Sequence, residues 1–126
     1  MEPGPKVLVV EDEPMLSELL TEALTDKGFA VHAAPDAHGA LQHLRSGAHV
    51  DILFTDIDLG AGMDGAQLAR IARELRPKLP IIYASGRRSA GEFRTVPGST
   101  FLPKPYTLNQ VDATIARHLE KARSAA

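Results

Sequence analysis

Residues 7–13 read VLVVEDE, four apolar residues followed at once by three acidic ones. A short, continuous run of Val and Leu is typical of a strand that is covered on both faces, as in a parallel sheet. We therefore predict a strand over Lys6–Val10, with Glu11, Asp12 and Glu13 at its carboxyl end. Three charged side chains at the end of a buried strand make that end of the sheet the first place to look for a functional site.

Outward from this strand, short apolar runs alternate with segments of helical periodicity. The apolar runs predict four more strands, at Phe29–Ala34, Asp51–Thr55, Ile81–Ala84 and Thr100–Leu102. Helical spacing and terminal Asp, Gly and Pro residues predict helices at Pro14–Lys27, from Asp36 to near Gly47, at Gly65–Arg76 and at Leu108–Ala122. A further short helix is expected around Ala90–Arg94, inside the Gly- and Pro-rich stretch Gly86–Ser99. This alternation predicts an α/β fold, with a five-stranded parallel sheet and helices on both faces.

The composition indicates one small domain. The chain has 126 residues, 44% of them hydrophobic, and we expect a domain over 6–122 with an arm at 1–5 and a fraying helix end at 123–126. The formal net charge of −2 gives no reason to expect nucleic acid or a membrane surface as a partner. The chain lacks cysteine, and no apolar run approaches the roughly 20 residues that span a bilayer, so a cytoplasmic location is expected. The five histidines lack the spacing of a zinc motif, and we expect them at or near the surface.

Polar side chains also follow the other central strands. Asp56 and Asp58 follow the third strand, Ser85 the fourth and Lys104 the fifth. Because ligands bind at the carboxyl ends of the strands in open parallel sheets, these side chains are expected to share one site. Gathered carboxylates repel one another unless a cation joins them, and Mg²⁺ suits carboxylate and phosphate oxygens. An Asp carboxylate can attack phosphorus, while a lysine and a hydroxyl hold the phosphoryl oxygens.

Five segments, VLVVEDE, ILFTDIDL, GMDG, IIYASG and FLPKPY, resemble the motifs of receiver domains of bacterial two-component systems. They occur in the order and close to the spacing of that family, and the resemblance runs from about Lys6 to Leu119. It implies a stand-alone, CheY-like receiver with the flavodoxin-like (βα)5 fold, a doubly wound sheet in the order 2-1-3-4-5. It also implies a phosphorelay switch, which accepts a phosphoryl group from a phosphohistidine of a histidine kinase or phosphotransfer protein. The output would then be contact with an unknown downstream protein.

The resemblance assigns roles to individual residues. Asp56 matches the aspartate that accepts the phosphoryl group, and Lys104 and Ser85 match the residues that contact that group. Ser85 and Phe101 also match the two switch positions of the family, and the bond from Lys104 to Pro105 is often cis there. Such a protein is not an enzyme acting on other substrates, because it catalyses only its own phosphoryl transfer and autodephosphorylation.

The metal ligands are assigned in the same way. Glu11 and Asp12 match the acidic pair that holds Mg²⁺, with Asp12 the more direct ligand. Asp56 and the backbone carbonyl of Asp58 match the remaining protein ligands. Glu13 is assigned only to the start of the following helix, where a negative charge is favourable.

The loop after the third strand departs from the family pattern. The offset from Asp56 to Gly65 is one residue longer than in most relatives, and Gly60-Ala61-Gly62 replaces the usual Met-Pro-Gly. This loop is therefore expected to be longer and more flexible beside the metal. Asp58 and Arg87 lie at positions that vary in the family, and their opposite charges suggest a pair across the site.

Three other interpretations remain open from the sequence. The chain could be the receiver fragment of a hybrid histidine kinase. It could be a phosphohydrolase that uses Asp56 as nucleophile and Asp58 as acid and base, although a substrate cap is missing. It could also be a pseudo-receiver that binds partners without phosphorylation, although every expected site residue is present.

Overall fold

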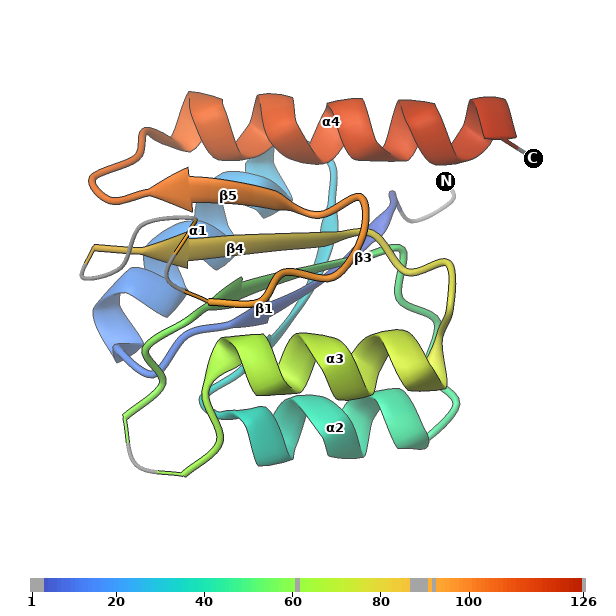
Figure 1. Cartoon of the computed structure of the whole chain (residues 1–126). Coiled ribbons are helices and arrows are strands. Elements are labelled where there is room, and N and C mark those ends of the chain that lie inside the picture. Colours follow the sequence, from blue (N-terminus) through green and yellow to red (C-terminus); the bar gives the residue numbers. More distant parts are fainter. Residues whose placement is uncertain (1–3, 61, 87–90, 92, 126) are drawn as a thin grey trace.

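The computed structural model describes residues 4–60, 62–86, 91 and 93–125. Within these residues, strands and helices alternate up to the fourth strand (Figure 1). The strands are β1 (Lys6–Val10), β2 (Ala30–Ala34), β3 (Ile52–Asp56), β4 (Ile81–Ser85) and β5 (Thr100–Pro103). The helices are α1 (Pro14–Asp26), α2 (Ala37–Arg45), α3 (Gly65–Leu75) and α4 (Leu108–Ala125).

The five strands form one parallel sheet in the order β2-β1-β3-β4-β5, as the flavodoxin-like prediction requires. The strand order reverses between β1 and β3, which is where ligands bind in sheets of this kind. Val10 pairs with Thr55, and Asp56 pairs with Ala84. The carboxyl ends of β1, β3 and β4 therefore lie side by side.

Two helices cover each face of the sheet (Figure 1). On one face α2 and α3 pack against β1, β3 and β4, and this core includes Leu8, Leu53, Ile81, Leu41 and Leu68. On the other face α1 and α4 pack against the same strands, and this core includes Val9, Phe54, Ile82, Leu20 and Ile115. Burial on both faces explains why the central strands consist of unbroken apolar runs.

The helix starts follow the predicted capping residues. The Asp36 carboxylate accepts a hydrogen bond from the Gly39 N–H at the start of α2. Asp64 and Gln67 form a reciprocal capping box at the start of α3. This arrangement fixes α3 directly behind the end of β3, where Gly65 donates its N–H to the Ile57 carbonyl.

Several element ends differ from the sequence prediction by one to three residues. β2 begins at Ala30 rather than Phe29, because the Phe29 N–H is used by the Leu24 carbonyl at the end of α1. β3 extends to Asp56, and α4 continues to Ala125 rather than ending at Ala122. Among the described residues, no helix is both long enough and apolar enough to cross a membrane.

Two residues of the short helix expected around Ala90–Arg94, Ala90 and Glu92, lie outside the described part of the chain. Phe93 and Arg94, which are described, lie in irregular backbone. The Tyr83 hydroxyl anchors the described end of this segment by accepting the Val96 N–H at 3.1 Å.

Candidate functional site at the carboxyl ends of the strands

A cavity of about 340 Å³ lies at the carboxyl ends of the strands, and we call it the acidic pocket. It is lined by Asp12, Asp56, Asp58, Gly60, Gly86 and Lys104. Glu11, Asp12 and Asp56 each offer a carboxylate oxygen within 4.8 Å of the others. Folding therefore brings together the acidic ends of β1 and β3, as the parallel sheet predicts.

Asp56 is the last residue of β3, and only 6% of its surface is exposed. Its Oδ2 accepts a hydrogen bond from Lys104 Nζ at 3.1 Å, and its Oδ1 accepts one from the Asp58 N–H at 3.2 Å. Burial raises the pKa of Asp56 above its ordinary value, although the bond from Lys104 acts in the opposite direction. Contact with Lys104 therefore does not fully offset the effect of burial on the Asp56 carboxylate.

Glu11 is more deeply buried than its neighbour Asp12, with 4% of its surface exposed. Its Oε2 accepts the Glu13 N–H at 3.0 Å, and Lys104 Nζ lies 3.6 Å from its Oε1. Burial, together with the negative charge of Asp56, raises the pKa of Glu11 to about 6. One lysine therefore serves two buried carboxylates, which leaves the site with an excess of negative charge.

Lys104 follows β5, and its ammonium contacts the carboxylates of both Glu11 and Asp56. Burial alone would lower the pKa of Lys104, but its hydrogen bond and charge interaction with Asp56 raise it above the ordinary value. Its own N–H donates to the Ser85 carbonyl at 2.9 Å, and its bond to Pro105 is cis. The ammonium is therefore held in its charged form at the acidic pocket.

Ser85 is 1% exposed and lies beside the acidic pocket rather than among the residues that line it. Its hydroxyl donates to Asp58 Oδ2 at 3.0 Å. The sequence suggested Arg87 as the partner of the Asp58 side chain, and it did not predict this contact with Ser85. The suggested partner, Arg87, lies outside the described residues.

Phe101 does not reach the acidic pocket. It is half-buried on β5, with its ring centroid 5.7 Å from that of Phe93, which in turn contacts Tyr83 edge-on. The other nearby aromatic residue, Tyr106, was not singled out from the sequence. Its hydroxyl is buried without a hydrogen-bond partner among the described residues, and burial with the charges of Glu11 and Asp56 raises its pKa. The sequence feature that could have identified Tyr106 is its position directly after Lys104 and Pro105.

Two glycines allow the backbone to approach the acidic residues closely. A Cβ on Gly65 would lie 2.1 Å from the Asp56 carbonyl oxygen, so any side chain there forces the start of α3 away from β3. Gly60 has φ +74°, and a Cβ there would lie 3.4 Å from Asp12 Oδ2. The loop after β3 therefore borders the acidic pocket, as predicted, and its greater flexibility stays a prediction.

The donor set of the acidic pocket fits a hard divalent cation. Its three clustered carboxylates offer only oxygen ligands, and two of them are buried with raised pKa values. A divalent cation would remove the net repulsion among these carboxylates, and it accepts oxygen ligands of this kind. The same pocket brings the Asp56 carboxylate and the Lys104 ammonium within 3.1 Å of each other.

Comparison with known proteins agrees with this geometry. The family described as the response regulator receiver domain matches residues 7–116. The sensor kinase CckA of Brucella abortus is 35% identical over 119 residues, which is 91% of this chain but 12% of that kinase. The chain therefore belongs to the family of response regulator receiver domains.

Solved structures give the same result for the fold. A response regulator receiver protein from Sinorhizobium medicae superposes with a TM-score of 0.89 at 37% identity, covering 94% of this chain and 97% of that one. The response regulator TrrA from Thermotoga maritima, solved in complex with Mg²⁺-BeF, has a TM-score of 0.82 at 23% identity. That match covers 91% of this chain and 99% of TrrA.

Proposed function

We propose that the chain is a phosphorylation-dependent signalling switch in which Asp56 accepts a phosphoryl group. The observation that carries the proposal is the buried Asp56 carboxylate, held by Lys104 Nζ at 3.1 Å within a cluster of three carboxylates. In the reaction, an Asp56 oxygen attacks the phosphorus of a phosphohistidine and the phosphorus–nitrogen bond breaks. The imidazole leaves with its electron pair and takes up a proton, and an aspartyl phosphate remains.

Mg²⁺ is the cation that this proposal requires. Glu11, Asp12, Asp56 and the backbone carbonyl of Asp58 are its proposed protein ligands, Glu11 through its charge and Asp12 more directly. When bound, the ion neutralises phosphoryl oxygens and so lowers the charge barrier to attack by a carboxylate. The protein's own contribution is to hold the Asp56 oxygens in a buried position where few waters compete.

Three further residues are proposed to respond to the phosphoryl group. Lys104 would move its contact from the Asp56 carboxylate to a phosphoryl oxygen, since a primary ammonium is a mobile point charge with three donors. Ser85 would turn its hydroxyl from Asp58 to a second phosphoryl oxygen. Phe101 would then turn inward from its contact with Phe93, which transmits the change to the surface.

The donor and output of this switch are also proposals. The phosphoryl group would come from a histidine kinase or a phosphotransfer protein, and the state of Asp56 would be read by a downstream protein through direct contact in the cytoplasm. Water would return the switch to rest by attacking the aspartyl phosphate, releasing inorganic phosphate and the free carboxylate. The chain would catalyse only these two steps on itself.

The test is phosphoryl transfer to the purified chain. The protein is incubated with Mg²⁺ and radiolabelled acetyl phosphate, and separately with a phosphorylated histidine kinase, and protein-bound label is measured. The wild type and the control Asp112→Asn, which changes a carboxylate on α4, should both take up label, whereas Asp56→Ala should take up none. Thermal unfolding establishes that the variants are folded.

Two outcomes would contradict the proposal. Equal labelling of Asp56→Ala and wild type would remove Asp56 as the acceptor. Steady turnover of small phosphate esters, without a stable phosphoprotein, would instead favour the phosphohydrolase interpretation.

A further inference from the structure

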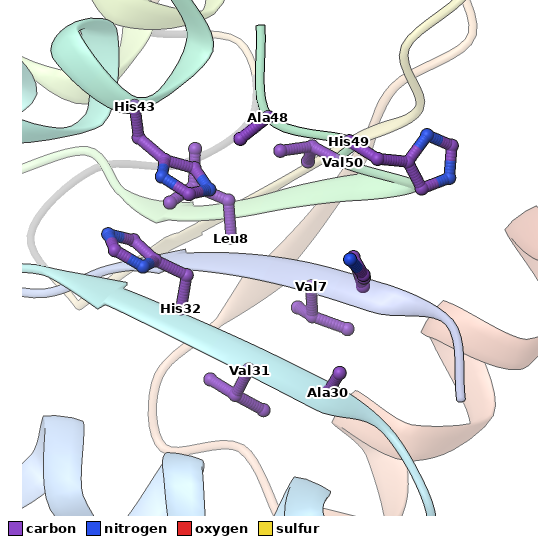
Figure 2. A pocket seen from close by; sticks show the side chains of 10 residues that line it. Val7, Leu8, Ala30, Val31, His32, His43, Ala48, His49 and Val50 are labelled. Atoms are coloured by element: carbon purple, nitrogen blue, oxygen red, sulfur yellow. The ribbon is translucent and has the colours of Figure 1, made fainter. Parts of the chain in front are cut away.

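A second cavity, of about 300 Å³, opens on the α2 and α3 face of the sheet, beside the edge strand β2 (Figure 2). We call it the histidine pocket, because three of the five histidines of the chain line it. Figure 2 shows His32 and His43 facing each other at one end of this pocket and His49 at the other end. The remaining lining comes from the first residues of β1 and β2 and from the segment before β3.

The pairing register of β1 and β2 makes the floor of the histidine pocket apolar. Side chains alternate along a strand, so Lys6 and Leu8 of β1 point to the same face as Ala30 and His32 of β2. The pairs Lys6 with Ala30 and Leu8 with His32 lie opposite each other in the sheet. Leu8 and the nearby Val50 therefore provide buried aliphatic surface beneath the charged and imidazole groups.

The groups around this floor are cationic or can become so. Among the described lining residues none is acidic, while Lys6 and three histidines are present. The nearest carboxylate on the same segment, Asp51, is already engaged, since it contacts His49 Nε2 at 2.8 Å and accepts the Lys6 N–H at 2.7 Å. Among the described residues that line the pocket, no carboxylate is left to balance Lys6, His32 and His43.

Arg76 removes a second source of negative potential. The carboxyl end of α2 points toward this region, and the free carbonyls of a helix end carry partial negative charge. Arg76 donates to the Leu44 carbonyl at 2.8 Å and to the Ala48 carbonyl at 2.6 Å, which satisfies those acceptors. An anion in the histidine pocket thus does not face a free carbonyl at Leu44 or Ala48.

The stacked pair gives the pocket a flat aromatic surface. The ring centroids of His32 and His43 lie 3.7 Å apart, with 9° between the ring planes. Two positively charged rings at this separation would repel, so the stack is favoured when at least one ring is neutral. Burial lowers the pKa of His43, and the positive charges of His32, Arg76 and Lys6 act in the same direction.

We propose that the histidine pocket binds a small aromatic carboxylate. The aromatic ring would pack against the imidazole stack and the exposed edge of Val50, above the buried Leu8, and the carboxylate would contact Lys6 and a histidine. A cavity of this size is at the lower end of the range for small-molecule sites, which matches a ligand of one or two rings. This site borders the first residues of β1, whereas Glu11 and the acidic pocket follow the carboxyl end of that strand.

The test uses 2-naphthoate as the probe and follows backbone amide shifts of the ¹⁵N-labelled chain. Saturable shifts are expected at Leu8, Ala30, His32 and Val50, with a dissociation constant in the millimolar range or below. Two matched probes separate the contributions: 2-naphthalenemethanol has the rings without the charge, and inorganic phosphate has charge without rings. The alcohol should bind up to about fivefold more weakly, since an exposed charge contact contributes up to about 1 kcal/mol, and phosphate should bind more weakly because it lacks the ring contacts.

Two variants locate the contact. Lys6→Met should weaken 2-naphthoate binding several-fold, whereas the control Lys121→Met, which changes an exposed lysine on α4, should leave it unchanged. Lys6 is exposed, so its replacement should not affect folding, and a melting curve checks this.

Three outcomes would overturn the proposal: shifts spread over the whole surface, equal affinity for the alcohol and the acid, or the same loss of affinity in both lysine variants. Binding of Zn²⁺ at His32 and His43 with no response to 2-naphthoate would instead identify a metal site and would also reject the aromatic ligand.

Discussion

The acidic pocket and the histidine pocket both border β1, and they show opposite responses to burial. At the acidic pocket, burial raises the pKa values of Glu11 and Asp56. At the histidine pocket, burial lowers the pKa of His43. In each case the protein environment disfavours the charge that the residue would carry in water. Each pocket is therefore expected to be stabilised by a ligand of the opposite charge, a divalent cation in one and an organic anion in the other.

The largest expected effect is on cation binding at the acidic pocket. Asp12→Asn removes a charged, exposed carboxylate from the cluster that is proposed to hold Mg²⁺. The affinity for Mg²⁺ should fall by roughly a hundredfold, which is about 3 kcal/mol of binding free energy. Calorimetric titration measures this directly, with Glu13→Gln as the control because Glu13 is acidic, exposed and next in the chain. Equal losses in the two variants would mean that overall charge, rather than ligation, controls binding.

The next effect concerns the backbone that supports the acidic pocket. Gly65→Ala places a Cβ 2.1 Å from the Asp56 carbonyl oxygen, so α3 must move relative to β3. The free energy of unfolding should fall by about 2 kcal/mol, as for other overpacked sites. Urea unfolding measures it, and the histidine pocket, which lies at the other end of β1, should keep its amide shifts. An unchanged midpoint would show that the start of α3 accommodates a side chain freely.

The sequence predicted the acidic pocket better than the histidine pocket, and the reason is physical. Apolar runs and parallel strand order bring Glu11, Asp12 and Asp56 to one edge of the sheet whatever the side-chain rotamers are. The stacking of His32 on His43 depends instead on how α2 packs against β2, and residue spacing carries no signal for it. The contact between Ser85 and Asp58 is likewise a matter of rotamers.

Element ends were the other part that sequence patterns left uncertain. The start of β2 depends on whether Phe29 bonds to the sheet or to the end of α1, and both are compatible with an apolar residue at that position. Residues Asp36 and Asp64 were predictable as caps because a side-chain oxygen next to a helix start has a specific hydrogen-bond function.

A smaller expected effect, on stability, separates the contribution of charge in the acidic pocket from that of side-chain size. Glu11→Gln keeps the size of the side chain and an oxygen that can accept the Glu13 N–H, but it removes the negative charge. Because the pKa of Glu11 is raised to about 6, the metal-free protein should gain about 1–2 kcal/mol of stability at pH 7.5. Unfolding in the presence of a chelator tests this, and added Mg²⁺ should reverse the order of the two proteins. A loss of stability without metal would mean that the contact with Lys104 outweighs burial.

The smallest effect is the pH dependence at the histidine pocket. Since the pKa of His43 is lowered below 6.5 in the folded chain, the unfolded chain takes up the proton first as the pH falls. The contribution of His43 to stability is therefore present above pH 6.5 and is lost as the pH falls toward its lowered value. The difference in unfolding free energy between wild type and His43→Gln should shrink across this range. The exposed His38→Gln serves as the control, and a matching trend in that variant would contradict the assignment to His43.

The hydrogen bond from Ser85 to Asp58 has a consequence for how the switch would be set. The Ser85 hydroxyl already donates to a carboxylate when Asp56 is unmodified. This hydrogen bond stabilises the unphosphorylated arrangement by about 1 kcal/mol or more. The hydrogen bond from Ser85 to a phosphoryl oxygen on Asp56 would have to be more favourable than this bond before Ser85 changes partner. In the proposed switch, the loop residue Asp58 would therefore shift the ratio of resting to active molecules toward the resting state.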